Sequence, residues 1–342
     1  MSSITKIKAA INLLNKDPLF YLFLSSKELF HSNFWFWLSE KNQNEASKLF
    51  SSTLISIPKF KREKKSKEKN LDNIIVDLLI SDNEKPAVII ENKIKDFPKI
   101  EQLKLIEKYY KDPNNEFVLV SLFSPNHLNL GVWNFISYAD IAHKINANNF
   151  TSDSFEVALI DRYRSFILKL SDLANLLPRT RDYDFAIKFD QELFTALNEI
   201  KFWEVYQKMR ASDLVHDFVK KYPGVEVYYG INHQKATIGF YLEFSGYKIG
   251  IQLEDNQFRR YIHGVKAQEI GLEMQNGNLF FKSNWNKKEN FLKYGHDWRY
   301  QYDLMEKPYS FDDLFSNIDY ELDILRNNES AIISIIKNSS SI

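Results

Sequence analysis

Blocks of apolar and polar positions in the first half of this chain predict an ordered series of helices and strands. Two short apolar runs, 73–81 and 87–94, are separated by a polar stretch with Asp, Asn and Pro, which predicts a β-hairpin. A helix at 98–111 and a buried apolar strand at 117–122 are expected next. Helical patterns flank this group at 4–24, 27–41, 138–147 and 153–177. The strand–strand–helix–strand order predicts a mixed α/β core with helices on its faces.

A change of pattern near residue 178 divides the chain into two predicted domains. Residues 176–182 combine leucines, a proline and charged side chains, and they interrupt the helical pattern. Two helices and three strands with half-buried alternation are expected after them, at 183–203, 204–221, 225–229, 236–244 and 247–253. We therefore predict one domain over residues 1–177 and an α+β domain over residues 178–342.

The composition narrows the class of protein. The chain has 342 residues and no cysteine, which excludes disulfides and thiolate metal sites and fits a reducing cytoplasm. No apolar run approaches the roughly 20 residues of a membrane span, and no signal-peptide pattern opens the chain. The formal net charge is +0, so only local charge can indicate a nucleic-acid partner. A cytoplasmic protein without a membrane partner is expected.

Three charged residues stand in the two apolar runs that form the predicted hairpin. They are Asp77 in the first run, and Glu91 and Lys93 in the second. Alternation along a strand puts Glu91 and Lys93 on one face, and Asp77 on the neighbouring strand can share it. Two carboxylates with the backbone carbonyl of Asn92 form an all-oxygen ligand set that suits Mg²⁺, with Mn²⁺ as a substitute. The alternative is a surface hairpin in which Glu91 and Lys93 form a simple ion pair.

This arrangement resembles the PD-(D/E)XK nuclease superfamily. Asp77 and the Glu91-Asn92-Lys93 triplet stand as the D…E-x-K element, within a string, 89–94, that is similar to one bacterial branch. The helix segment 28–38 and Gln102-Leu103 resemble two further elements of that branch, in the same order. The resemblance covers about residues 20–175. It implies a restriction-endonuclease-like mixed sheet flanked by helices and Mg²⁺-dependent hydrolysis of DNA, with Asp77, Glu91, Lys93, Glu28 and Gln102 as catalytic residues.

The resemblance also implies roles for residues outside the hairpin. Glu28 would contribute a metal ligand or a contact near the metal, although Ser25 and Glu28 also fit a helix capping box. His31 shares a helical face with Glu28 and would contact the phosphate or brace Glu28. Gln102 would orient Lys93 or the DNA backbone. The family's tyrosine four residues later is Ile106 here, so Tyr109 is the candidate substitute, one turn further along the helix.

Two basic clusters are candidates for nucleic-acid contact. The segment 59–69 holds seven basic and two acidic residues and is expected to be a mobile loop near the site. Its candidate phosphate contacts are Lys61, Arg62, Lys64 and Lys65. In the second domain, Arg259 and Arg260 stand beside aromatic residues, which suits either nucleic-acid binding or a packed core.

Three functional hypotheses follow. The first is a Mg²⁺-dependent DNA endonuclease, in a setting such as defence against phage or mobile DNA, with the second domain setting specificity, binding a protein partner or forming a homodimer. The second is a catalytically silent module of the same fold that binds nucleic acid or a protein. The third is a structural or regulatory protein dominated by residues 178–342. Replacing Glu91 by Gln separates the first hypothesis from the others, because only a catalyst loses cleavage.

Overall fold

The computed structural model describes residues 3–17, 19–20, 23, 27–65, 75–94, 100–125, 129–177, 191–232, 235–254, 257–282, 291–294, 296–304 and 311–340. The chain divides into two compact units. The first contains the described residues up to Leu177 together with Glu192–Tyr206, and the second contains Gln191 and the described residues from Gln207 onwards. The predicted boundary at residue 178 adjoins residues 178–190, which lie outside the described residues. The helix that follows them groups with the first unit.

A five-stranded mixed sheet in the order β1-β2-β3-β4-β5 forms the centre of the first unit. These strands span Pro58–Lys65, Ile75–Asp82, Lys85–Lys93, Glu116–Ser121 and Trp133–Ser137. The first three strands are antiparallel, whereas β4 and β5 run parallel to β3. A parallel pair needs a crossover, and helix α5 (Ile100–Tyr109) provides it between β3 and β4. The predicted α/β class with a mixed sheet flanked by helices is confirmed.

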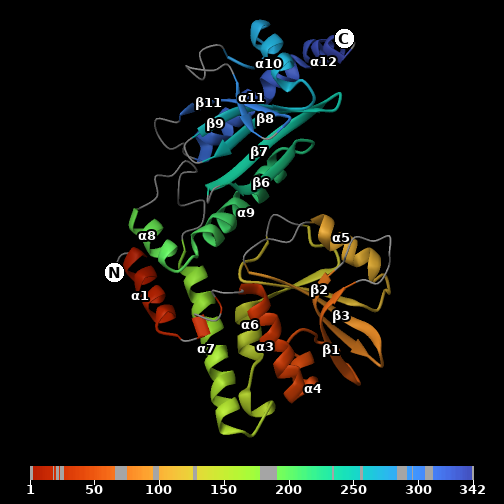
Figure 1. The fold of residues 1–342 in the computed structure, drawn as a ribbon, viewed down its shortest axis with the longest axis vertical. Helices are drawn as coiled ribbons and strands as arrows, with labels where there is room; N and C mark the ends of the chain where they lie inside the picture. Colours follow the sequence, from red (N-terminus) through yellow and green to blue (C-terminus); the bar gives the residue numbers. More distant parts are fainter. Residues whose placement is uncertain are drawn as a thin grey trace. The chain divides into compact units, whose positions relative to one another are not determined.

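Helices cover both faces of this sheet (Figure 1). The helix α3 (Lys27–Lys41) contacts β1, β2 and β3 on one face, on the same side as α6 (Tyr138–Lys144). On the other face, Leu103 and Ile106 of α5 pack with Ile89 and Leu119 of the sheet. The first unit also contains the helices α1 (Ser3–Asn15), α4 (Gln43–Ser47), α7 (Ser154–Leu176) and the short 3₁₀ helix η1 (Ala147–Asn149). Helix α8 (Gln191–Glu199) belongs to it from Glu192 onwards.

The β2–β3 hairpin is the element that carries the predicted site. Its turn is formed by Asn83 and Glu84, both with positive φ, at 48° and 68°. Two-residue turns of this handedness match the twist of paired strands, and asparagine tolerates the conformation well. The predicted hairpin is therefore confirmed, with a tighter turn than the polar stretch alone suggested.

The second unit contains a six-stranded antiparallel sheet in the order β10-β11-β9-β8-β7-β6. Its strands span Glu226–Asn232 (β6), Lys235–Phe244 (β7), Tyr247–Glu254 (β8), Gln257–His263 (β9), Leu292–Tyr294 (β10) and Trp298–Leu304 (β11). Its helices are α10 (Ala267–Asn276), α11 (Phe311–Asn327) and α12 (Glu329–Ser340), and α9 (Trp203–Lys221) leads into it. The α+β character predicted for this region is confirmed.

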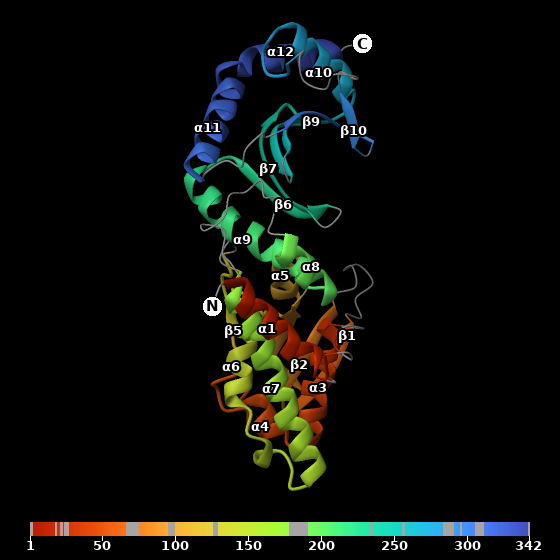
Figure 2. The same ribbon diagram turned by 90° about the vertical axis from the view of Figure 1, so that its left-hand side faces the viewer.

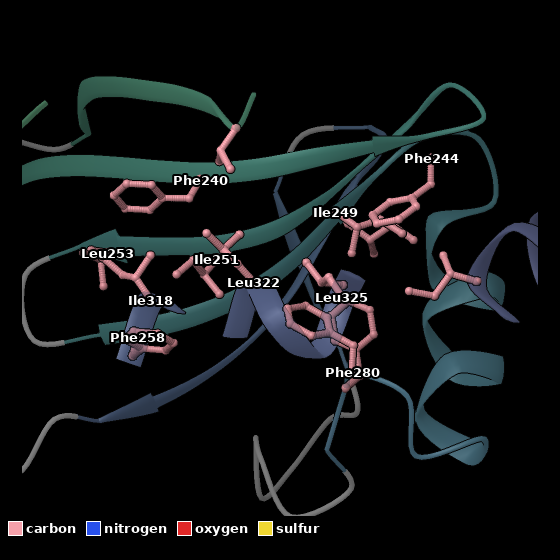
Figure 3. Close-up of a cluster of buried hydrophobic side chains, with 14 of the residues drawn as sticks. Phe240, Phe244, Ile249, Ile251, Leu253, Phe258, Phe280, Ile318, Leu322 and Leu325 are labelled. Atoms are coloured by element: carbon pink, nitrogen blue, oxygen red, sulfur yellow. The ribbon is translucent and has the colours of Figure 1, made fainter. Parts of the chain in front are cut away.

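One face of this sheet is buried under helices. Phe240, Ile251 and Phe258 belong to a single hydrophobic cluster with Ile318 and Leu322 of α11. Figure 3 shows these side chains between the strands and the helix, and Figure 2 shows α10, α11 and α12 along the same side of the sheet. Alternation therefore directs the intervening strand positions to the opposite face.

Two sequence-based predictions of local structure are wrong. The segment 59–69 was expected to be a loop, but residues 58–65 form strand β1, which pairs with β2 with Phe60 opposite Ile80. Residues 66–69 lie outside the described residues. The stretch 133–137 forms β5 although no strand was predicted there.

No helix among the described residues is long and apolar enough to cross a membrane.

Candidate active site

The three charged residues of the hairpin lie on adjacent strands at neighbouring positions. Leu78 of β2 is opposite Ile90 of β3 in the antiparallel register. One step further along this register places Asp77 opposite Glu91, and side chains directly opposite on antiparallel strands share a face. Lys93 lies two residues beyond Glu91 and so shares that face as well. The geometry agrees with the same-face arrangement that the sequence predicted.

Glu91 is the centre of this cluster. Lys93 Nζ lies 2.7 Å from Glu91 Oε1, and Gln102 Nε2 donates a hydrogen bond of 2.8 Å to the same oxygen. The Glu91 side chain is only 2% exposed and that of Lys93 is 16% exposed. A carboxylate in such a place needs a cation and hydrogen-bond donors, because the loss of water disfavours its charge. Lys93 of β3 supplies the cation, and Gln102 of α5 supplies a hydrogen-bond donor.

Asp77, which belongs to β2, is tied to β3 by a hydrogen bond to its backbone. Its Oδ2 accepts a 2.7 Å hydrogen bond from the backbone N–H of Asn92. Asp77 is half-buried, whereas the Asn92 side chain is completely buried. This bond ties the carboxylate of Asp77 to the segment that carries Glu91 and Lys93.

The side chain of Asn92 points to the opposite face, as alternation requires. Its Oδ1 accepts a hydrogen bond from the Tyr138 hydroxyl of α6, and its Nδ2 donates one of 3.2 Å to Ser32 Oγ of α3. Sequence reasoning considered only the backbone carbonyl of Asn92 and missed this network. An amide between two charged residues of an apolar strand is the signal that could have revealed it, because a buried amide needs partners. The network anchors the strand behind the charged residues.

The helical repeat of α5 places Gln102 on the side that faces the sheet, one turn before Ile106. Leu103 and Ile106 pack against the sheet, and Gln102 next to them reaches Glu91. Tyr109, the predicted substitute for the family's tyrosine, is half-buried near the end of α5, with its ring 4.8 Å from that of Tyr110. Glu28 lies in α3, and its side chain is outside the described part of the structure.

The predicted phosphate contact by His31 is wrong. The His31 side chain is completely buried, with Nδ1 2.9 Å from the Tyr163 hydroxyl of α7 and the ring stacked 6.1 Å from that of Phe166. Burial lowers the pKa of His31 from 6.5 to about 3, so the imidazole is neutral at neutral pH. His31 therefore belongs to the aromatic core of the first unit.

This burial makes the stability of the first unit depend on pH. The unfolded chain binds a proton at His31 near pH 6.5, whereas the folded chain does so only near pH 3. Stability is therefore fully present above pH 6.5 and falls as the pH drops below it, by about 2 kcal/mol between pH 7 and pH 5. We expect His31→Phe to reduce this dependence in denaturant titrations. The matched variant of the exposed His143, His143→Asn, should keep it, and equal slopes in all three proteins would contradict the assignment.

The basic residues of β1 have partners within the fold. Lys61 Nζ lies 3.5 Å from Glu84 Oε2, and the guanidinium of Arg62 donates to Asn33 Oδ1 and lies 5.7 Å from the Phe36 ring centre. Both side chains are exposed, so contact with a phosphate stays a prediction. The side chains of Lys64 and Lys65 lie outside the described residues. Lysines on an edge strand also discourage pairing with other chains.

Arg260 does not lie on a nucleic-acid surface. Its side chain is 1% exposed, its Nη2 lies 2.6 Å from Glu321 Oε1, and its Nη1 donates to the Phe280 carbonyl. Alternation in β9 places Arg260 on the helix-covered face between Phe258 and Ile262. Of the two alternatives left open by the sequence, nucleic-acid binding is therefore wrong for Arg260 and the packed core is confirmed.

Arg259 is also ion-paired, but on the other face of the sheet. Its guanidinium donates two hydrogen bonds, of 2.7 and 2.8 Å, to the carboxylate of Glu254. The two side chains are 8% and 10% exposed. Sequence reasoning missed Glu254, and this pair disfavours binding of a nucleic-acid phosphate by Arg259, because it already neutralises the Arg259 charge.

A metal ion at the β2–β3 site would have few protein ligands. The described residues contain no group of three or more His, Cys, Asp or Glu side chains placed to hold one. Asp77 and Glu91 still offer two carboxylates, and Mg²⁺ characteristically keeps several waters and binds proteins through one or two carboxylates. The donor chemistry therefore fits Mg²⁺.

Comparisons with protein-family models, with curated proteins and with solved structures find no match for this chain.

Proposed function

We propose that this chain is a Mg²⁺-dependent nuclease that hydrolyses phosphodiester bonds of DNA. The observation that carries the proposal is the cluster of Asp77, Glu91 and Lys93 on one face of two adjacent strands. A buried carboxylate beside a second carboxylate is costly to stability, so it favours a functional explanation over a structural one. The mixed sheet with α3 on one face and α5 on the other also supports the proposal, because it agrees with the fold that the sequence resemblance implied.

Each residue has a distinct part in this proposal. Asp77 and Glu91 would hold Mg²⁺ or Mn²⁺, and the bound ion would supply a Lewis acid that polarises a phosphate oxygen and acidifies a water. The Lys93 ammonium, 2.7 Å from Glu91 Oε1, would neutralise charge on a phosphate that approaches this carboxylate. Gln102 holds Glu91 in position through its 2.8 Å hydrogen bond. The buried Asn92 network keeps the strand rigid behind them.

A second candidate is a catalytically silent module of the same fold that binds nucleic acid or protein. The observation that favours it is the engagement of Glu91 Oε1 by both Lys93 and Gln102, with the Glu91 side chain 2% exposed. Such a pair can simply neutralise a buried charge. Cleavage assays on matched variants distinguish the two candidates.

The direct test is cleavage of supercoiled, linear and single-stranded DNA by the purified chain with and without a divalent ion. We expect cleavage with Mg²⁺ or Mn²⁺ and none in excess EDTA, because two carboxylates and a lysine provide no metal-independent route to a strong nucleophile. A Glu91→Gln preparation purified in parallel controls for contaminating nucleases. Equal cleavage by the chain in excess EDTA would contradict the proposal.

Lys93→Ala should lower the cleavage rate by about 100-fold, because it removes the positive charge nearest the proposed phosphate position. The matched control is Lys104→Ala, which removes an exposed lysine of α5. Calorimetric titration with Mn²⁺ should show that Lys93→Ala still binds metal. A rate equal to that of the unaltered chain would exclude Lys93 from the mechanism.

A further inference from the structure

The second unit contains a cavity that the proposed cleavage chemistry does not use. It has a volume of about 290 Å³ and lies on the sheet face opposite the helix-covered core. The strands β6, β7, β8, β9 and β11 all contribute to its lining. Its size is at the lower end for small-molecule sites, so it suits a ligand of one or two rings.

Aromatic side chains form much of the cavity wall. They are Tyr228, Tyr241, Tyr261, Trp298 and Tyr300. The ring centres of Tyr261 and Trp298 are 5.2 Å apart, and those of Tyr241 and Tyr261 are 5.9 Å apart. These contacts hold the rings in fixed positions, so little side-chain freedom remains to be lost when a flat ligand stacks on them.

A buried ion pair adds polar groups to the lining. Arg259 and Glu254 form a two-bond pair, and Arg259 Nη1 also donates a 3.0 Å hydrogen bond to Gln252 Oε1. The Arg259 guanidinium lies 4.8 Å from the ring centre of Tyr300. The cavity wall therefore presents donors and acceptors beside aromatic faces, with the charges of Arg259 and Glu254 balanced.

The Tyr261 ring is part of the cavity wall, whereas its hydroxyl is fully enclosed. Tyr261 is 3% exposed and lines the cavity, and its hydroxyl has no hydrogen-bond partner among the described residues. Burial raises the pKa of Tyr261 well above its ordinary value, so the group is a permanent donor. A buried hydroxyl without an acceptor costs stability, so a ligand acceptor in the cavity would be favoured once the Tyr261 ring turns its hydroxyl toward it. Glycine at position 239 leaves room for this hydroxyl, because a Cβ there would lie 3.3 Å from it.

We propose that this cavity binds a nucleobase, either as a free nucleotide or as an unstacked base of a single strand. A nucleobase has a flat face for the aromatic wall and ring acceptors for the Tyr261 hydroxyl. Its edge can pair with the mixed donors and acceptors of Arg259, Glu254 and Gln252. A methylated ammonium ion, which aromatic cages also bind, is disfavoured because Arg259 and Arg299 both line this cavity. The inference stands independently of the nuclease proposal, since it shares no residue with the β2–β3 site.

The test is calorimetric titration of the full chain, in EDTA, with the four nucleoside monophosphates of DNA and with a short single-stranded oligonucleotide of mixed sequence. We expect saturable binding of at least one probe. Trp298→Ala should weaken it by about tenfold or more, because stacking on one aromatic ring is lost. Tyr261→Phe, which removes only the hydroxyl, should weaken it by about threefold to tenfold. The matched control is Tyr320→Ala, an exposed tyrosine of α11 whose loss should change nothing.

The outcomes separate the two sources of the base. Monophosphate binding that Trp298→Ala and Tyr261→Phe both weaken supports a free nucleotide. Oligonucleotide binding that both variants weaken, without monophosphate binding, supports a base of a single strand. The proposal is overturned if no probe binds at about millimolar concentration, if both variants bind like the unaltered chain, or if tetramethylammonium binds more tightly than every nucleotide. Melting curves identify any variant that fails to fold, and the conservative Tyr261→Phe change then decides.

Discussion

Glu91→Gln is expected to lower the rate of metal-dependent DNA cleavage by about 100- to 1000-fold while leaving the fold intact. The substitution keeps the size of the side chain and an oxygen that can accept the hydrogen bond from Gln102. It removes the negative charge that would hold the metal and that pairs with Lys93 Nζ at 2.7 Å. The measurement is single-turnover cleavage in Mg²⁺, with a melting curve for each protein.

The matched control for this prediction is Glu107→Gln in the same helix that carries Gln102. Glu107 accepts a 2.8 Å hydrogen bond from Trp133 Nε1, so both substitutions change one hydrogen-bonded carboxylate of the first unit into an amide. Only Glu91→Gln should affect cleavage. Loss of cleavage in both variants would point to a general disturbance of the unit. Unchanged cleavage in Glu91→Gln would exclude Glu91 from the active site and favour the silent-module alternative.

The charged cluster was predictable because local patterns encode it. Alternation fixes Glu91 and Lys93 on one face whatever the rest of the fold. The short turn at Asn83 and Glu84, together with a one-residue register shift between Ile80 and Ser81, then brings Asp77 opposite Glu91. The two strands and the turn are contiguous in the sequence, so no distant contact was needed to place these residues together.

The errors arose where distant packing decides the outcome. His31 shares a helical face with Glu28, but its burial depends on Tyr163, which is 132 residues away in α7. Residues 58–65 are rich in lysine and form a strand only because β2 pairs with them. Alternation alone puts Arg260 on the apolar face with Phe258 and Ile262. Its partner Glu321, 61 residues later, is not apparent from sequence patterns.

Glu321→Gln is expected to destabilise the second unit by about 3 kcal/mol. Removing one charge of a buried pair leaves the other charge uncompensated in a medium that disfavours it. Arg260 is 1% exposed and packs 4.9 Å from the Phe280 ring centre, so its guanidinium cannot turn to solvent without opening the core. The measurement is hydrogen exchange of amides in β9 and α11, which reports the free energy of opening this part of the chain.

The control lies two residues away on the same helix. Asp319 pairs with Lys221 at 2.9 Å, but the two side chains are 46% and 42% exposed, so Asp319→Asn should change stability by less than about 1 kcal/mol. The double variant Arg260→Met with Glu321→Leu should recover most of the loss, because replacing a whole buried pair by apolar residues is often neutral. Equal effects of Glu321→Gln and Asp319→Asn would show that burial does not control the energy of this pair. Failure of the double variant to recover stability would instead show that the hydrogen bond from Arg260 to the Phe280 carbonyl, and not charge balance alone, stabilises this part of the second unit.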